Sequence, residues 1–548
     1  MTDIIVAYVR EAYSTEVMPE LSRPEPQFGD FATNVALKLA KTAGKNPREI
    51  AEKIAAHLRE DHLIASAEVA GPGFVNIRLR DSALLESVDH GHKTPGAYRG
   101  QVVVIETNNP NPFKDLHIGH AYNCIIADTI ANLLDAGGAH VHRVSYHGDV
   151  GLHVGKSMWA ILKFIGNDPA KLDEVPAGER PKFMSERYVE GAAAYKEEPQ
   201  ARQEIETLAK ESFAPEDPVY KQVYETCKSW SFDYISETVK QLGSQPVEKS
   251  YLESQADAVG VQTVREHVGQ VFTESDGAVV FAGEAFGLHT RVFIASRGTG
   301  LYEARDLGLM QLKQQDFHPS KSYIVTGGEQ REYFRVVIKA AEMSLPELAG
   351  VTQNISTGTV KLASGKMSSR EGNVLNIAWL FDQLTTALAA RGGKADDSET
   401  LVGALRYTML RVRVGSDVIF DVDAALSLDG NSGPYLQYAH ARGCSIKSKS
   451  DLSAEKLGDD IVFDPAERAL AVKLSEYHEA RDAAIRELLP HHVCTYLYEL
   501  AQEFNRFYEK SRIIDDPREG IRLSLLERYI ATLESGLTLL GIPAPEKM

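Results

Sequence analysis

Residues 108–124 read NNPNPFKDLHIGHAYNC, and this stretch decides the fold. The loop at its start is too rich in Asn and Pro for a helix. A helical pattern follows, with apolar residues at positions 118, 122, 125, 126, 133 and 134 before Gly137. The apolar run at 101–106 (QVVVIE) before the loop is typical of a buried parallel strand, and 139–149 reads as the next strand. This order predicts a Rossmann-like parallel sheet, the start of a multidomain α/β protein.

The rest of the chain divides around that sheet. Residues 1–95 predict a small α+β domain, with helical stretches followed by an alternating stretch at 67–81 that contains a Gly-Pro-Gly turn. Residues 96–375 predict the sheet domain, interrupted at about 156–265 by a charged, mostly helical insertion. Residues 376–548 have an almost wholly helical pattern and predict a separate all-α bundle.

Composition limits the functional classes. A chain of 548 residues with 43% hydrophobic and 25% charged residues is expected to be a globular protein with several domains. It contains no apolar run of 18 residues, which argues against a membrane span. The 4 cysteines include no C-x-x-C pair, so we expect no zinc site and no disulfide framework, but a reduced, cytoplasmic setting. The net charge of -18 has the wrong sign for a nucleic-acid binder.

His117 and His120 fall at the start of the predicted helix. A helix N-terminus attracts anions, and imidazoles placed there can donate hydrogen bonds to phosphate oxygens. Gly119 between them leaves room for a base or a ribose. The pattern suits a nucleoside triphosphate, although two capping or core histidines would look the same in the sequence.

A second polar stretch, SGKMSSREGN at 364–373, carries Lys366 and Arg370 on either side of small hydroxyl residues. Two cations on such a loop can close on a triphosphate and stabilise the charge of leaving pyrophosphate. Taken alone, the stretch also fits an ordinary solvated turn.

Together, the two elements resemble the paired signature of class I aminoacyl-tRNA synthetases, in the expected order and on either side of an insertion. The resemblance implies that an amino-acid carboxylate attacks the α-phosphate of ATP and that the amino acid is then transferred to tRNA.

Acidic residues point to the amino acid. Glu106 ends the first strand, where a parallel sheet places ligand-binding groups, and Tyr302 and Asp306 share one face if their segment is helical. Two carboxylates and a phenol suit the planar donors of a guanidinium. The alternative is a structural ion pair of Asp306 with its neighbour Arg305 or with another local cation.

Several stretches resemble arginyl-tRNA synthetases in particular. PEPQFGDFATNVALKLAK (24–41) and GPGFVNIRL (71–79) are similar to that family's N-terminal domain, which contacts the tRNA elbow. ETNNPNPFKDLHIGH, YHGDVGLHVG, YLESQADAVG, LYEARDLG and TGGEQREYFRVV resemble its catalytic blocks. GPYLQYAHAR and LTLLGIPAPEKM resemble its anticodon-binding domain.

The resemblance implies a role for each matching residue. The residues implied to bind arginine are Glu106, Asn109, Asn111, Tyr302, Asp306 and Gln330. Those implied to act on the ATP phosphates are Lys114, His117, His120, Lys366 and Arg370. Those implied to line the ATP site are Gly119, Met367, Ser368 and Ser369, with both histidines. Those implied to contact tRNA are Phe28, Gly29, Asp30, Asn34, Tyr435, Gln437, Tyr438, His440, Arg442 and Met548.

The implied ligands are tRNA(Arg), L-arginine and ATP with Mg²⁺, and the family resemblance favours a monomer. The charge objection is met in part by the locally basic stretch AHARGCSIKSKS, preceded by Arg406, Arg411 and Arg413. For Tyr435 and Tyr438, core packing is as plausible as RNA contact.

The chain departs from the family pattern at three places. Asn109 stands where Ser is frequent, His153 where many members carry Gln, and Glu371 where a basic residue is common. These departures put in doubt the contacts near the amino acid and the closure of the loop on ATP. The alternatives are another class I synthetase, a nucleotidyltransferase that uses no RNA, or a non-catalytic tRNA-binding paralogue.

Overall fold

The computed structural model describes residues 1–91, 95–114, 116–363, 376–394, 397–452, 454, 457–458 and 460–548. At its centre lies a five-stranded parallel sheet, with the strands in the order β12-β11-β5-β6-β7. The strands are β5 (Val102–Asn108), β6 (His140–His147), β7 (Lys249–Leu252), β11 (Lys321–Gly327) and β12 (Thr352–Thr357). Val103, Val104 and Ile105 of β5 are fully buried, as its apolar run predicts. The predicted Rossmann-like sheet is confirmed.

Helix α5 (Ile118–Ala136) follows β5 and packs against β5, β6 and β11. Its apolar face, including Ile125, Ile126 and Leu133, is fully buried. The sequence around residue 108 therefore places the start of α5 at the carboxyl ends of the parallel strands, where ligands bind in open α/β sheets.

The insertion is helical, as predicted, and has its own core. Its elements are α6 (Leu152–Ile165), η2 (Pro169–Glu174), η3 (Ala177–Glu179), α7 (Arg180–Glu197), α8 (Pro199–Glu211) and α9 (Pro218–Gln241). Its predicted extent needs a correction, because β7 and α10 (Glu253–Glu266) lie within 156–265 and β7 belongs to the central sheet. A four-residue strand is too short to show a hydrophobic period.

A small antiparallel sheet, in the order β10-β9-β8, precedes β11. It contains β8 (Thr273–Ser275), β9 (Ala278–Phe281) and β10 (Arg291–Ile294), with η4 (Gly283–Phe286) between the last two. It shares a core with α11 (Tyr302–Phe317) and α12 (Arg331–Ser344), which includes the buried rings of Phe272, Phe281 and Phe293. The short turns η5 (Gly328–Gln330) and η6 (Pro346–Leu348) flank α12.

The N-terminal domain has an antiparallel sheet, in the order β1-β2-β4-β3. Asn46 accepts a hydrogen bond from the Arg48 amide at 2.9 Å and so caps α3, as its position before Pro47 predicts. The Gly-Pro-Gly turn joins β3 to β4. The elements are α1 (Thr2–Tyr13), β1 (Leu21–Ser22), η1 (Pro26–Phe28), β2 (Phe31–Thr33), α2 (Val35–Ala43), α3 (Pro47–Leu58), β3 (Ile64–Ala70), β4 (Phe74–Leu79) and α4 (Asp81–Gly91).

The C-terminal part is a helical bundle, with one exception to the predicted all-helical pattern. Strand β14 (Val418–Phe420) pairs in parallel with β13 (Val360–Leu362), and this pair ties the bundle to the sheet domain. The helices are α13 (Ile377–Ala390), α14 (Ser398–Leu410), α15 (Val422–Ala425), α16 (Gly433–Lys447), α17 (Pro465–Ser475), α18 (Tyr477–Glu487), α19 (His491–Lys510) and α20 (Glu519–Leu539).

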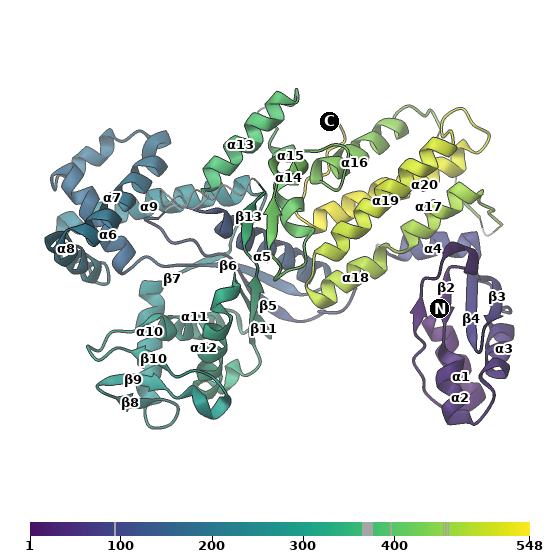
Figure 1. The fold of residues 1–548 in the computed structure, drawn as a ribbon, viewed down its shortest axis with the longest axis horizontal. Helices are drawn as coiled ribbons and strands as arrows, with labels where there is room; N and C mark the ends of the chain where they lie inside the picture. The colour runs from purple at the N-terminus through teal and green to yellow at the C-terminus, as the bar shows by residue number, and fades with distance from the viewer. Residues whose placement is uncertain are drawn as a thin grey trace.

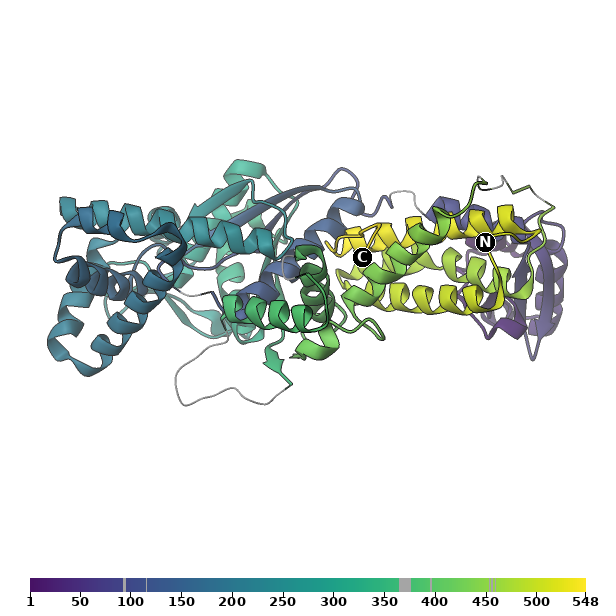
Figure 2. The same ribbon diagram turned by 90° about the horizontal axis from the view of Figure 1, so that it is seen from above.

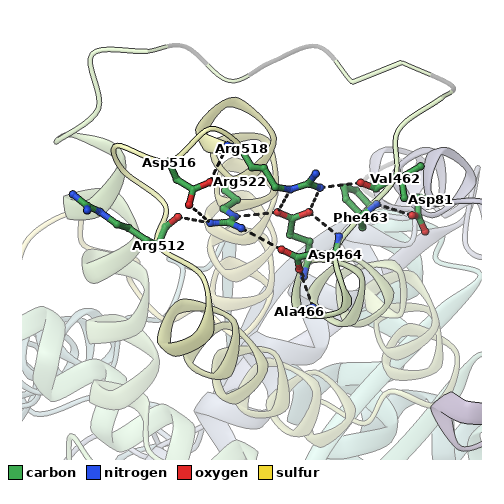
Figure 3. Close-up of polar contacts among 10 residues, drawn as sticks. Asp81, Val462, Phe463, Asp464, Ala466, Arg512, Asp516, Arg518 and Arg522 are labelled. Atoms are coloured by element: carbon green, nitrogen blue, oxygen red, sulfur yellow. Dashed lines mark hydrogen bonds and ion pairs between the residues drawn. The ribbon is translucent and has the colours of Figure 1, made fainter.

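The molecule is elongated, with the N-terminal domain at one end and the inserted helices α6–α9 at the other (Figure 1; Figure 2). The N-terminal domain sits against the helical bundle. Near this contact, Figure 3 shows Arg518 and Arg522 converging on one carboxylate, that of the fully buried Glu467 in α17. Within the described part of the chain, no helix is long and apolar enough to cross a bilayer.

Candidate active site

A cavity of about 1040 Å³ opens at the carboxyl ends of the parallel strands. Strand ends contribute Glu106, Tyr146 and Thr357, and the first turn of α5 contributes Gly119 and His120. The cavity gathers nine of the predicted residues from separate parts of the chain: Glu106, Asn109, Asn111, His117, Gly119, His120, Tyr302, Asp306 and Gln330.

His117 and His120 form a stacked pair, with ring centroids 3.6 Å apart. The His117 backbone amide donates to Nδ1 of His120 at 3.2 Å. Burial, with a smaller effect from the neighbouring positive charges, lowers the pKa of His117 and lowers that of His120 to about 3. Both rings are therefore neutral near pH 7. Because Nδ1 of His120 accepts a hydrogen bond, its proton is on Nε2, and the ring presents a donor.

Gly119 is needed for the stacking of His117 and His120, for a steric reason that the sequence does not reveal. A Cβ atom at this position would lie 3.0 Å from Cε1 and Nδ1 of His117. The glycine therefore makes room for the imidazole, besides lining the cavity as predicted.

Glu106 already has partners. Its Oε1 accepts from Nζ of Lys313 at 2.6 Å, and its Oε2 accepts from Nδ2 of Asn109 at 2.6 Å. The ion pair is almost fully buried, with both side chains 1% exposed. Glu106 is thus largely neutralised from within the protein, which differs from the expectation of a carboxylate free to hold a guanidinium.

Asp306 differs from Glu106, because it forms no ion pair among the described residues. Its Oδ2 accepts from the Tyr333 hydroxyl at 2.5 Å. Burial, which outweighs that hydrogen bond, raises the pKa of Asp306 to about 8. The alternative pairing with Arg305 is wrong, because Arg305 binds Glu253 and Asp257, each at 3.0 Å. Asp306 therefore presents to the cavity a carboxyl group that has no cation partner among the described residues and that is mostly protonated near pH 7.

Asn111 accepts from the Gly148 amide at 2.9 Å, and a Cβ at Gly148 would lie 2.9 Å from the same Oδ1 atom. His153 bonds the Gly148 carbonyl through Nε2 at 2.7 Å and does not line the cavity. His153, which stands where many family members carry Gln, therefore contacts the backbone of Gly148, and the amide of that same residue bonds Asn111. Tyr302 begins α11, one helical turn before Asp306, as predicted.

Lys114 lines a smaller hollow beside the cavity, together with Asn111 and Trp230. Its charge contributes to the lowered pKa of both histidines. The residues predicted to close over ATP (Lys366, Met367, Ser368, Ser369 and Arg370), and Glu371, lie outside the described residues.

Of the residues implied to contact RNA, three are buried and bonded within the protein. Gln437 donates to the Glu399 and Pro543 carbonyls, and His440 bonds the Pro545 carbonyl, so both hold the C-terminal segment. Asp30 pairs with Arg468 at 2.7 Å. Arg406, part of the basic stretch, is also fully buried, and it pairs with Asp128 at 2.8 Å.

The other residues implied to contact RNA fall into two groups, those that make contacts within the protein and those with exposed side chains. Tyr435 and Arg442 both bond Asn505, which fits the packing alternative for Tyr435. Asn34 bonds Glu20 at 3.3 Å, and the left-handed Gly29 lies against the Ile77 carbonyl, where a Cβ would clash. Exposed large side chains remain at Phe28, Tyr438 and Met548.

Three cavity or near-cavity residues escape the sequence reasoning: Tyr146, Lys313 and Tyr333. Tyr146 lies at the end of its strand, as Glu106 does, so the rule that sites form at strand ends could have found it. Lys313 is seven residues after Asp306 in α11, which places it on the same face of that helix.

Three family models match consecutive parts of the chain. They are the arginyl tRNA synthetase N terminal domain at residues 1–79, the class I (R) tRNA synthetase catalytic domain at 82–395, and the DALR anticodon binding domain at 436–548. The chain belongs to the arginyl-tRNA synthetases. The family resemblance drawn from the two motifs is therefore confirmed.

Relatives of known activity cover nearly the whole chain. The arginine–tRNA ligase of Hyphomonas neptunium is 31% identical over 96% of this chain and 95% of its own, and that of Bdellovibrio bacteriovorus is 30% identical over 96% and 93%. Among solved structures, the arginyl-tRNA synthetase of Thermus thermophilus superposes with a TM-score of 0.81, at 25% identity, over 100% of this chain and 99% of that one.

The family membership also fixes the reaction class. The chain is an arginine–tRNA ligase of class I, which uses ATP to activate arginine and transfers it to tRNA(Arg). The alternatives of another amino-acid specificity and of a non-catalytic paralogue are not favoured.

Proposed function

We propose that the cavity binds arginine with its guanidinium on Asp306 and holds ATP along the first turn of α5. The observation that carries this assignment is the Asp306 carboxylate, which faces the cavity without a cation partner among the described residues. A bound guanidinium would supply the missing positive charge and lower the pKa of Asp306. Tyr302, Asn111 and Gln330 line the same cavity and would orient the rest of the amino acid.

In this arrangement, Glu106 has a supporting role. Lys313 and Asn109 hold its carboxylate in place, and it contributes a wall of the pocket. Residual acceptor capacity on Glu106 would add to guanidinium binding, but the main electrostatic attraction comes from Asp306, because its charge is not already balanced.

The ATP phosphates are placed against His117 and His120. Nε2–H of the neutral His120 can donate to a phosphate oxygen, and the positive end of the α5 dipole favours the same anion. Lys114 would add positive charge from the neighbouring hollow. Lys366 and Arg370 are proposed to neutralise the leaving pyrophosphate, with Met367, Ser368 and Ser369 beside the nucleotide.

We further propose that Mg²⁺ enters on the ATP phosphates, since Mg²⁺ is commonly held by substrate phosphates. In the described part of the chain, no group of three or more His, Cys, Asp or Glu forms a metal cage.

The proposed domains are residues 1–95 for tRNA binding, 96–375 for catalysis and 376–548 for the anticodon. Exposed Phe28, Tyr438 and Met548 are the proposed RNA-facing side chains, because unstacked bases pack well on exposed rings and apolar groups. The enzyme is proposed to act as a cytoplasmic monomer.

The test is ATP–pyrophosphate exchange with each of the twenty amino acids, with and without total tRNA, for the wild type and Asp306→Asn. We expect exchange with arginine, and a loss in kcat/KM for arginine of roughly one to two orders of magnitude in Asp306→Asn. Exchange that appears only with tRNA would show that RNA completes the active site. Exchange by Asp306→Asn equal to the wild type would overturn the pocket assignment.

A further inference from the structure

The hydroxyl of Tyr146, at the carboxyl end of β6, is an unused hydrogen-bonding group of the cavity. The hydroxyl is buried and makes no hydrogen bond with any described residue, although the tyrosine lines the cavity. A buried phenol nearly always finds a partner, because leaving it unpaired costs about 1–3 kcal/mol. An exception inside a ligand cavity therefore points to a partner that arrives with the ligand.

The surroundings of this hydroxyl identify that partner's charge. Burial, and then the charges of Asp306, Glu253 and Glu106, raise the pKa of Tyr146 well above its usual value, while Arg305 opposes them. The phenol therefore stays protonated. Its oxygen, which lies among these acids, can accept from a cationic donor.

Other polar groups near it are occupied. Glu253 and Arg305 bond each other, Glu106 bonds Lys313, and Tyr333 bonds Asp306. The Tyr146 backbone is itself fixed, because its amide donates to Oδ1 of Asn109 at 3.0 Å. The backbone of Tyr146 is thus fixed at the strand end, and its hydroxyl has a hydrogen-bonding position left for a ligand.

We propose that Tyr146 is a substrate-binding residue whose hydroxyl oxygen accepts a hydrogen bond from the guanidinium of arginine. This assignment rests on the proposed binding of arginine at Asp306. A guanidinium presents five N–H donors in a plane, so it can serve Asp306 and Tyr146 together.

The experiment compares wild type, Tyr146→Phe and Tyr529→Phe in the full enzyme. Tyr529 also has a buried hydroxyl without a partner among the described residues, but it lies in α20 and outside the cavity, which makes it a matched control. Arginylation of tRNA gives the KM for arginine and for ATP. The inhibition constant of n-butylguanidinium, which has the guanidinium but neither α group, reports that end alone.

We expect Tyr146→Phe to raise the KM for arginine and the inhibition constant of n-butylguanidinium together, by roughly 10- to 100-fold. The KM for ATP and the melting temperature should stay near wild type, and Tyr529→Phe should change none of these values. A matched rise in both constants supports the assignment.

Two results overturn it while leaving the enzyme's function intact. One is an unchanged KM for arginine in Tyr146→Phe, and the other is a raised KM with an unchanged constant for n-butylguanidinium, which places the contact at the α groups. A fall in melting temperature greater than that of Tyr529→Phe would also contradict the role, since it indicates a structural one. A wild type that charges no arginine would instead refute the proposed function.

Discussion

At the scale of single residues, the arginine end of the cavity is defined by which charges already have partners. Glu106 pairs with Lys313, Glu253 and Asp257 share the single cation of Arg305, and Glu303 pairs with Arg291 at 3.2 Å. Asp306 is left with a hydrogen bond from Tyr333 and with no ion pair in the described chain. A monocationic side chain would stabilise the ionised form of Asp306, whereas an apolar one would leave this buried carboxyl group protonated near pH 7.

The affinity for arginine should depend on pH through Asp306. Its pKa is about 8 because of burial, and in the proposed complex the guanidinium binds the ionised carboxylate. The KM for arginine should therefore rise as the pH falls below about 8, by up to tenfold per pH unit. His120 is not the cause, because its pKa of about 3 keeps it neutral across this range. Arginylation kinetics between about pH 6.5 and 9 measure this dependence.

Asp306→Asn is the control, and its KM should be high and nearly independent of pH over that range. The same residue links pH to folding. The pKa in the folded protein lies above the ordinary 3.8, so the contribution of Asp306 to stability is full below that value and is lost as the pH rises towards 8. As the pH rises from 3.8 towards 8, the melting temperature of the wild type should therefore fall relative to that of Asp306→Asn. An equal pH slope for KM in both proteins would contradict the assignment.

At the scale of elements, α5 and α11 bring the proposed ATP site and the proposed guanidinium site into one cavity. The start of α5 holds the stacked histidines, and the start of α11 holds Tyr302 and Asp306. Lys313, two turns further along α11, bonds Glu106 of β5. That ion pair fixes the helix to the sheet, and so sets the position of Asp306 relative to α5.

Gly119→Ala should separate activity from stability. Its Cβ would press on the His117 ring from 3.0 Å, and a shift of this ring should lower kcat/KM for ATP by roughly 10- to 100-fold. Stability should be unchanged or higher, since Ala favours a helix by up to about 1 kcal/mol over Gly. Gly178→Ala, where a Cβ would meet no atom within 4 Å, is the matched control. Pyrophosphate exchange and thermal melts test both, and full ATP affinity in Gly119→Ala would contradict the expectation.

Lys313→Met should lower the free energy of unfolding by roughly 3–5 kcal/mol, because it leaves the Glu106 carboxylate buried without its cation. Adding Glu106→Gln should recover part of the loss. Lys361→Met, which breaks the exposed pair with Asp417, should cost far less, because solvent screens that pair. Urea unfolding followed by circular dichroism measures all three, and equal losses for Lys313→Met and Lys361→Met would show that burial of the pair does not matter.

At the scale of the whole molecule, ion pairs hold the N-terminal domain to the helical bundle. Arg468 of α17 bonds Asp30 and Asp81. The Phe463 amide also donates to Asp81, at 2.8 Å (Figure 3). The same helix carries Glu467, which binds Arg518 and Arg522. A tRNA that contacts both ends of this assembly would depend on the rigidity of the contact.

Arg468→Met should weaken docking of the N-terminal domain by roughly 2–5 kcal/mol, since it leaves two partly buried aspartates without their cation. We expect a several-fold higher KM for tRNA and a larger radius of gyration by X-ray scattering. The KM for arginine and for ATP at saturating tRNA should change little. Arg528→Met is the control, because its partner Asp89 is 57% exposed. Equal tRNA affinity in the wild type and Arg468→Met would show that the domain contact does not serve RNA binding.

The sequence by itself determined the local elements and the place of the site. The apolar run at 101–106, the Asn- and Pro-rich loop and the periodic helix after it predict β5 and α5, because strand and helix periods are local properties. The end of a parallel strand then locates the cavity. Strand β7 was missed because four residues carry too short a pattern.

Only the tertiary structure decided which charged side chains have an ion-pair partner. Glu106 and Asp306 are both acidic residues at expected positions, yet Glu106 is paired with Lys313, 207 residues away, and Asp306 is not. Likewise, Gln437 and His440 have the residue types of an RNA surface but are buried against the C-terminal segment. Pairing and burial depend on contacts between distant segments, and no local pattern records them, so the sequence located the cavity, while the fold decided which of its acidic residues lacks an ion pair among the described residues.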